Sequence, residues 1–308
     1  MADRRPVIIT CAITGAIHTP SMSPHLPANS EAIIASALGA AEAGAAILHL
    51  HARGDETGQP DQSVEGFARI VPPIAAQTDA VLNLTTGGSP YMAVAERVRP
   101  AAHFAPQLAS LNMGSMNMGL FPMQARYPDV QGWEKAHLEG SRDLVFRNSY
   151  DDITHVLAAC RDNGTRFEFE CYDTSHLYNL AHFADTGAVQ PPFFVQTVFG
   201  LLGGIGAHPD DIAHMRRTAH RLFGDDIVWS ALGAGAHQMR VAATVVSGGG
   251  HVRVGLEDSL WSGPGTLSAS NAEQVRTAVT LIETLGCRAA TPEEVRTMLC
   301  LPNQKIAA

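Results

Sequence analysis

The chain has 308 residues, and its 30 acidic side chains outnumber the 21 basic ones, which gives a formal net charge of −9. Among the basic residues only Lys135, in a polar stretch, and Lys305, near the C-terminus, are lysines. A Schiff-base enzyme needs a lysine that is desolvated in a pocket, so the sequence argues against that chemistry. An acidic balance without clusters of Lys and Arg also argues against nucleic acid as a partner.

The cysteines and the apolar runs indicate the cellular compartment in which the protein is expected. The 5 cysteines are odd in number and widely spaced, so they do not form the pattern of a disulfide framework or a zinc ribbon. The apolar run after Arg4 and Arg5 is short, rich in β-branched residues and followed by no clear cleavage site, which favours a first strand over a secretory signal. No run reaches the roughly 18 apolar residues of a membrane span. We therefore expect a soluble, cytoplasmic protein with no membrane partner.

Strand-like and helix-like segments alternate along the chain, with no change of composition that would mark a linker. Runs rich in β-branched residues predict strands at 6–15, 46–53, 81–87, 109–115, 166–173, 192–200, 227–233 and 251–258. Helical periodicity predicts helices at 30–44, 63–77, a short one from 91, and then 151–163, 175–187, 208–223, 237–247 and 271–285. In the first helix Ser30 is the expected N-cap and Gly44 the expected residue after the C-cap. The segment from 116 through 140 is expected to be irregular.

Eight strand–helix pairs predict a single (β/α)₈ TIM barrel that forms one domain over residues 1–308. The alternative fold is a doubly wound open sheet, which eight strands also allow. In a barrel the chemistry lies at the carboxyl ends of the strands, on the alternate positions that face inward. Polar residues at those positions are therefore the candidates for a functional site.

Two histidines end the second predicted strand. Alternation along the strand puts His49 and His51 on one face and the flanking Leu48 and Leu50 on the other, toward the helices. Two neutral imidazoles side by side are good ligands for a zinc-like ion. The alternative interpretation is a pair of hydrogen-bonded histidines in the core.

The eighth predicted strand carries a cation and two carboxylates. Arg253, Gly255 and Glu257 share one face, with Gly255 expected to clear space between the two charged side chains. Glu257 is the natural third metal ligand, which leaves the open position of a catalytic zinc. Arg253 is suited to hold a carboxylate through two hydrogen bonds, and Asp258 to act as a base. The alternative is an Arg–Glu ion pair across the end of the barrel.

The remaining candidates lie on strands three, four and five. Glu168, Glu170 and Tyr172 are expected to face inward while Phe167, Phe169 and Cys171 pack outward. Buried carboxylates need partners, which Arg253 or a metal-binding histidine would supply. Candidates for contacts with polar atoms of a substrate are Thr85, Ser110 and Asn112. Hydroxyl side chains at strand ends are also ordinary turn formers.

Six motifs occur together over nearly the whole chain: TCAITGA at 10–16, LHLHAR at 48–53, TTGG at 85–88, LNMG at 111–114, EFE at 168–170 and GGHVRVGLED at 249–258. In this combination the chain resembles the β-keto acid cleavage enzymes, whose founding member is 3-keto-5-aminohexanoate cleavage enzyme. The resemblance implies a zinc-dependent (β/α)₈ barrel, a homotetramer, and condensation of a β-keto acid with the co-substrate acetyl-CoA. Acetoacetate and a new acyl-CoA are the products it implies.

The resemblance also assigns roles to individual positions. His49, His51 and Glu257 match the zinc ligands, and Arg253 matches the residue that holds and polarises the keto acid. The other matches are Asp258 for the base, Glu170 for a carboxylate that supports the catalytic group, and Thr85 and Ser110 for hydroxyls that contact the substrate.

Two departures from the founding enzyme bear on the substrate. That enzyme has an acid after TGA that meets the substrate ammonium, whereas this chain has Ile17. A less polar or uncharged β-keto acid is therefore expected, with Ile17 contacting it. Ala236 stands where the founding enzyme has an Arg. The rival enzyme class is a zinc hydrolase of the amidohydrolase kind, which also places His-x-His on a barrel strand but adds histidine ligands on strands five and six.

Overall fold

Eight parallel strands close into a barrel in the order β10-β11-β12-β13-β2-β3-β6-β7 in the computed structural model, which describes residues 4–89, 91–302 and 306. This confirms the TIM barrel and excludes the open sheet. The barrel strands are β2 (Ile9–Ala12), β3 (Ile47–Leu50), β6 (Val81–Thr85), β7 (Leu108–Asn112), β10 (Arg166–Cys171), β11 (Phe193–Phe199), β12 (Ile227–Gly233) and β13 (His251–Val254).

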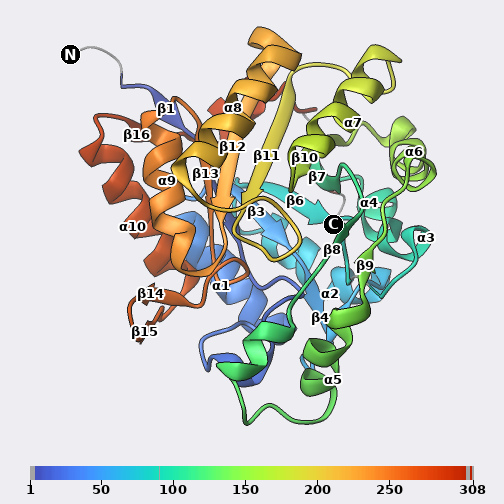
Figure 1. Ribbon diagram of the computed structural model, residues 1–308, viewed down its shortest axis with the longest axis vertical. Helices are drawn as coiled ribbons and strands as arrows, with labels where there is room; N and C mark the ends of the chain where they lie inside the picture. Colours follow the sequence, from blue (N-terminus) through green and yellow to red (C-terminus); the bar gives the residue numbers. More distant parts are fainter. Residues whose placement is uncertain (1–3, 90, 303–305, 307–308) are drawn as a thin grey trace.

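The helices surround the barrel, as Figure 1 shows. They are α1 (Ser30–Glu42), α2 (Val64–Ala75), α3 (Val94–Arg97), α4 (Arg99–Phe104), α5 (Gly132–Gly140), α6 (Tyr150–Ala159), α7 (Thr174–Asp185), α8 (Pro209–Phe223), α9 (Gln238–Ser247), α10 (Asn271–Thr284) and α11 (Pro292–Met298). Within the described ranges, no helix is both long enough and apolar enough to cross a membrane.

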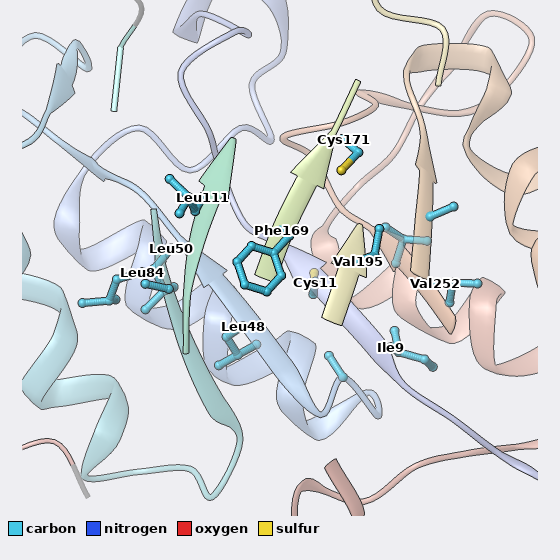
Figure 2. Packing of buried hydrophobic residues seen from close by; sticks show 14 of the residues in the cluster. Ile9, Cys11, Leu48, Leu50, Leu84, Leu111, Phe169, Cys171, Val195 and Val252 are labelled. Atoms are coloured by element: carbon cyan, nitrogen blue, oxygen red, sulfur yellow. The ribbon is translucent and has the colours of Figure 1, made fainter. Parts of the chain in front are cut away.

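The largest core cluster lies between the barrel and its helices. Strand residues that point outward, among them Leu48, Leu50, Phe169 and Cys171, pack there with side chains from the helices. Figure 2 labels these four side chains on β3 and β10. Period-2 alternation along each strand sends the intervening residues into the barrel, so the predicted inward and outward faces of β3 and β10 are confirmed.

The barrel interior is apolar at the amino ends of the strands and polar further along them. The amino ends of the strands contribute an apolar cluster that includes Ile47, Val81, Leu108 and Phe194, and Val295 of α11 packs against it from below. One pleat higher, the inward residues are polar and fully buried: Thr10, Asn83, Ser110, Glu168, Gln196 and Ser230. The short strands β1 (Pro6–Val7) and β16 (Arg288–Ala289) pair beside the floor. The sequence analysis did not predict either β16 or α11.

The segment after β7 is ordered rather than irregular, which corrects the sequence-based expectation. The strands β8 (Met116–Asn117) and β9 (Val145–Phe146) pair antiparallel, and α5 lies between them in the sequence. Apolar side chains from this segment, including Met118, Leu120 and Phe146, form a separate cluster over the carboxyl end of the barrel. Figure 1 shows α5 at the end of the molecule that also carries the hairpin of β14 (Trp261–Gly263) and β15 (Thr266–Leu267).

Two local expectations also need correction. The first helix is capped by Asn29, whose side chain accepts a hydrogen bond from the Ala32 N–H, rather than by Ser30. Gly44 follows the C-cap with φ +116°, as predicted. The eighth strand ends at Val254, not at 258, because the chain turns at Gly255.

Candidate active site

A small cavity opens at the carboxyl ends of β3, β6, β7 and β10. Its lining includes two histidines and two glutamates, His49, His51, Glu170 and Glu257, together with Tyr172. Apolar side chains from the loop after β2 and from the segment after β7 complete the wall: Ile17, Met118, Leu120 and Phe146. The cavity therefore has one charged end and one apolar end.

His49, His51 and Glu257 bring their ligand atoms together at the charged end. One atom from each residue lies within 4.8 Å of the others. Glu257 Oε1 is 3.6 Å from Nε2 of His49 and 3.6 Å from Nε2 of His51. All three residues are buried, and two imidazoles with a carboxylate form a donor set that suits zinc and related divalent ions.

The local structure explains how each of the three residues reaches this point. His49 lies on β3 and His51 directly follows it, so the alternation of the strand carries both inward. Glu257 reaches the same point through the turn at Gly255 (φ +143°), and its N–H donates to the Ala12 carbonyl. A side chain on Gly255 would collide with the backbone of Ala12. Gly255 thus permits a close backbone approach, rather than clearing space between Arg253 and Glu257 as expected.

Arg253 is surrounded by three carboxylates. Its Nε and Nη2 both donate to Asp258, at 2.9 Å each, and Nη2 also donates to Glu257 Oε1 at 2.7 Å. Its Nη1 donates to Glu170 Oε1 at 3.1 Å. The side chains of all four residues are at most 10% exposed. The predicted partners of the buried carboxylates are therefore present, with Arg253 at their centre.

The charges in this group do not balance. One guanidinium faces three carboxylates, and the buried carboxyl group of Glu168 lies in the same barrel. Burial, followed by the neighbouring acidic groups, raises the pKa of Glu257, although Arg253 opposes the shift. Burial by itself disfavours the charge of Arg253, but the three carboxylates raise its pKa well above the ordinary value. An added divalent cation would correct this excess of negative charge.

The two histidines are neutral in this environment. Burial and the nearby Arg253 lower the pKa of His49 well below its ordinary value. The same causes lower the pKa of His51 to about 3. A neutral imidazole is the form that binds a metal, and Oε2 of Glu257 is buried with no hydrogen-bond partner. The residues present therefore fit a divalent metal ion.

The structure places the other predicted residues at different depths. Thr85 and Asn112 line the cavity with Ile17, whereas Ser110 is buried below it and is absent from the described lining. The Thr85 hydroxyl oxygen accepts hydrogen bonds from the N–H groups of Gly87 and Gly88, at 3.0 and 3.4 Å, so its own O–H is left to donate. Asp258 is 6% exposed and contacts Arg253 from outside the described lining.

Two residues around the loop after β2 were given no role in the sequence analysis. Arg53 is buried and donates to Thr14 Oγ1 and to the carbonyl oxygens of Thr14, Gly15, His18 and Gly58. Its position two residues after His51, with the same strand parity, was a signal that it points inward. Glu134 of α5 accepts hydrogen bonds from Thr19 and Ser21 of the same loop. No sequence signal pairs Glu134 with residues more than a hundred positions away.

Known proteins resemble this chain over nearly its whole length. It is 62% identical over 302 residues to 3,5-dioxohexanoate:acetyl-CoA acetone transferase of Paraburkholderia graminis, a match that covers 98% of this chain and 97% of the relative. It is 33% identical over 294 residues to 3-keto-5-aminohexanoate cleavage enzyme of Acetoanaerobium sticklandii, covering 95% of this chain and 97% of the relative.

Solved structures agree with the fold. The apo structure of ObcA superimposes with a TM-score of 0.70 at 20% sequence identity, over 91% of this chain and 66% of the ObcA chain. At that identity the similarity establishes the fold alone.

A family model for the beta-keto acid cleavage enzymes matches residues 6–301. The match covers every barrel strand and all of the cavity lining. Strand β10 carries glutamates and β11 has no histidine, so the ligands of the rival hydrolase class are missing from these two described strands. The chain belongs to the beta-keto acid cleavage enzyme family and is an acyltransferase that cleaves a carbon–carbon bond.

Proposed function

We propose that the protein transfers the acyl part of 3,5-dioxohexanoate, or a closely similar uncharged β-keto acid, to coenzyme A. Acetyl-CoA is the co-substrate, and the products are acetoacetate and acetoacetyl-CoA. The observation that carries this choice is the apolar end of the cavity, made by Ile17, Met118, Leu120 and Phe146. Burying an ammonium or a second carboxylate against such a wall is costly. The relative that is 62% identical bears the name of the same substrate.

The bonds that change can be stated in full. C2 of the keto acid loses a proton and bonds to the acetyl carbonyl carbon, and the thioester C–S bond breaks. The released thiolate then attacks C3 of the keto acid, and the C2–C3 bond breaks. The proton returns to C2, so acetoacetate leaves and the remaining acetoacetyl group stays on coenzyme A.

We propose His49, His51 and Glu257 as the ligands of a Zn²⁺ ion. When bound, the ion supplies a Lewis acid for the keto oxygen, which makes the C2 proton more acidic. The support is the convergence of the three ligand atoms within 4.8 Å and the excess of buried negative charge around Arg253. The site is buried, so these charges act through a weakly screening medium.

The chain's own residues bind the substrate and move its proton. Thr85 offers its O–H and Asn112 its amide to polar atoms of the keto acid in the cavity; Ser110 supports the same strand end from below. Asp258 is proposed as the base that takes the C2 proton. Arg253 holds Asp258 and Glu170 in place through hydrogen bonds, and its positive charge favours an anionic substrate nearby.

The test is a product assay with acetyl-CoA labelled with ¹³C at the carbonyl carbon and a panel of β-keto acids. The proposal expects label in acetoacetate and none in acetoacetyl-CoA when the substrate is 3,5-dioxohexanoate. The value of kcat/KM is expected to be about 10-fold or more above that for 3-keto-5-aminohexanoate, because the wall lacks a partner for the amine. Acid release without any CoA ester would instead indicate hydrolysis.

A substitution in the apolar wall tests whether this wall determines the substrate preference. Replacing Ile17→Glu is expected to lower kcat/KM for 3,5-dioxohexanoate about 10-fold and to raise it for the amine-bearing substrate. The matched control is Val145→Glu, because Val145 is 57% exposed next to the wall residue Phe146. An unchanged substrate preference in the Ile17→Glu variant would contradict the assignment of the wall.

We further propose that residues 1–308 act as one catalytic domain in the cytoplasm, and that the protein forms the homotetramer that the family resemblance implies. Sedimentation equilibrium of the purified protein checks the oligomeric part of this proposal. A monomer at working concentration would contradict it.

A further inference from the structure

The middle of the barrel is polar at a level where such barrels ordinarily pack branched apolar side chains. Six inward residues from six strands are at most 1% exposed there: Thr10, Asn83, Ser110, Glu168, Gln196 and Ser230. Leaving a buried polar group without a hydrogen-bond partner destabilises the fold, so a polar layer of this kind needs an explanation. Glu168 is the strongest case, because it is 0% exposed and potentially charged.

Asn83 connects Glu168 to the candidate metal ligand His49. Its Nδ2 donates to Glu168 Oε2 at 2.7 Å. Asn83 and His49 are direct neighbours in register on β6 and β3. Nδ1 of His49 lies 4.0 Å from Glu168 Oε2, which places this nitrogen on the Glu168 side of the ring. Nε2 lies on the other side, toward Glu257.

The hydrogen-bonding chemistry of the three groups fixes the direction of this chain of contacts. Asn83 turns its NH₂ group toward Glu168, whose carboxyl oxygen accepts the hydrogen bond. The amide oxygen is then left for His49, and it too can only accept. Oδ1 of Asn83 and Nδ1 of His49 are both buried on strands paired in register, and neither atom has a hydrogen-bond partner among the described residues. The pairing is therefore satisfied when Nδ1 of His49 carries the proton.

We propose that Asn83 and Glu168 are positioning residues that hold His49 with its proton on Nδ1, which leaves the lone pair of Nε2 to bind the metal. This inference rests on the metal site proposed above at His49, His51 and Glu257. Groups that orient a metal-binding histidine in this way typically change metal affinity 10- to 100-fold when they are removed. The costly burial of Glu168 then has a function, because the carboxylate fixes the orientation of the amide.

The first experiment reads the tautomer directly in the metal-free wild-type protein. Two- and three-bond ¹H–¹⁵N correlations of histidine-labelled protein distinguish Nδ1–H from Nε2–H, and a His49→Gln variant identifies the signals. The proposal expects the Nδ1–H pattern for His49. The Nε2–H pattern would overturn it without any substitution in the polar layer.

The second experiment measures the dissociation constant of Zn²⁺ by titration calorimetry. The Asn83→Leu variant keeps the side-chain volume but breaks the chain of contacts, and it is expected to weaken binding about 10- to 100-fold. The Glu168→Gln variant keeps an oxygen that can accept from Asn83, so its affinity is expected to stay within about threefold of wild type. Far-UV circular dichroism of the metal-free variants establishes that they fold.

The matched control is Gln196→Leu. Gln196 lies in the same layer on β11 and is fully buried, but no hydrogen bond links it to His49. Its replacement is expected to leave Zn²⁺ affinity unchanged. Equal losses in Gln196→Leu and Asn83→Leu would overturn the proposal, and so would wild-type affinity in Asn83→Leu. A wild-type protein that binds no Zn²⁺ would instead contradict the metal site itself, with the tautomer result still valid.

Discussion

Two carboxylates on Arg253 compete for the role of the base. Asp258 accepts two hydrogen bonds from the guanidinium, whereas Glu170 accepts one and also lines the cavity. The Tyr172 hydroxyl donates to the second oxygen of Glu170 at 3.2 Å, and burial raises the pKa of this carboxyl group. The resemblance to the family favours Asp258 as the base, whereas the position in the cavity lining favours Glu170.

Neutral variants separate the two carboxylates. Asp258→Asn is expected to lower kcat by about 10³-fold or more with the metal content unchanged, because the amide cannot take a proton. Glu170→Gln is expected to keep a larger fraction of kcat, since the amide oxygen still accepts from Arg253. Single-turnover release of tritium from C2 measures the proton step alone. A fully active Asp258→Asn variant beside an inactive Glu170→Gln variant would transfer the role to Glu170.

The sequence predicted some of these residues better than others. Strict alternation on a strand placed His49 and His51 on one inner face, and the structure shows them there. Glu257 was predicted from the same rule, yet it arrives through a turn that begins at Gly255. Arg53 binds backbone carbonyls that are exposed only once the loop after β2 has folded, so its partners could not be predicted from residue types.

At the scale of elements, α5 matters most because it fastens the segment after β7 onto the loop that carries Ile17. Glu134 is the contact: it is 8% exposed and accepts from the hydroxyls of Thr19 and Ser21. His137, also buried on α5, lies against the backbone of Ala16 and Ile17. The sequence could not predict this contact, because α5 has too few apolar residues at helical spacing to indicate a helix that packs on a core.

Glu134→Ala is expected to raise KM for the keto acid about 10-fold while leaving the metal content unchanged, because the wall residues lose their support. Hydrogen–deuterium exchange of residues 132–140 is expected to become faster. The control is Glu139→Ala on the same helix, where Glu139 is 55% exposed and pairs with Lys135. Equal effects of the two substitutions would show that the contact with the loop is unimportant.

At the scale of the whole molecule, His251 links stability to pH from the far side of the barrel. Its Nδ1 accepts the N–H of Ile8 at 2.9 Å, which requires a neutral nitrogen. Burial, and then the charge of Arg5, lower the pKa of His251 to about 4 from an ordinary value of 6.5. Between these two values the unfolded chain binds more protons than the folded one, so stability increases with pH.

The free energy of unfolding is therefore expected to fall as the pH is lowered from 6.5 to 4. The part that His251 contributes is at most about 3 kcal/mol, reduced by the partial exposure of the ring. His251→Asn keeps an acceptor for Ile8 but does not titrate, so its urea midpoint is expected to depend less on pH in this window. The control is His220→Gln at an exposed position of α8. Identical pH profiles for wild type and His251→Asn would contradict the assignment.

The closed amino end of the barrel bears on the order in which a metal ion and the substrate bind. Apolar side chains and α11 close the amino ends of the strands, and Glu170 and Glu257 line the cavity at the other end. A keto acid seated in that cavity stands between the metal ligands and bulk water. For the metal site proposed above we therefore expect ordered loading, in which the ion binds before the substrate and leaves after it. A chelator added to the working enzyme acts only in the intervals when the cavity is empty.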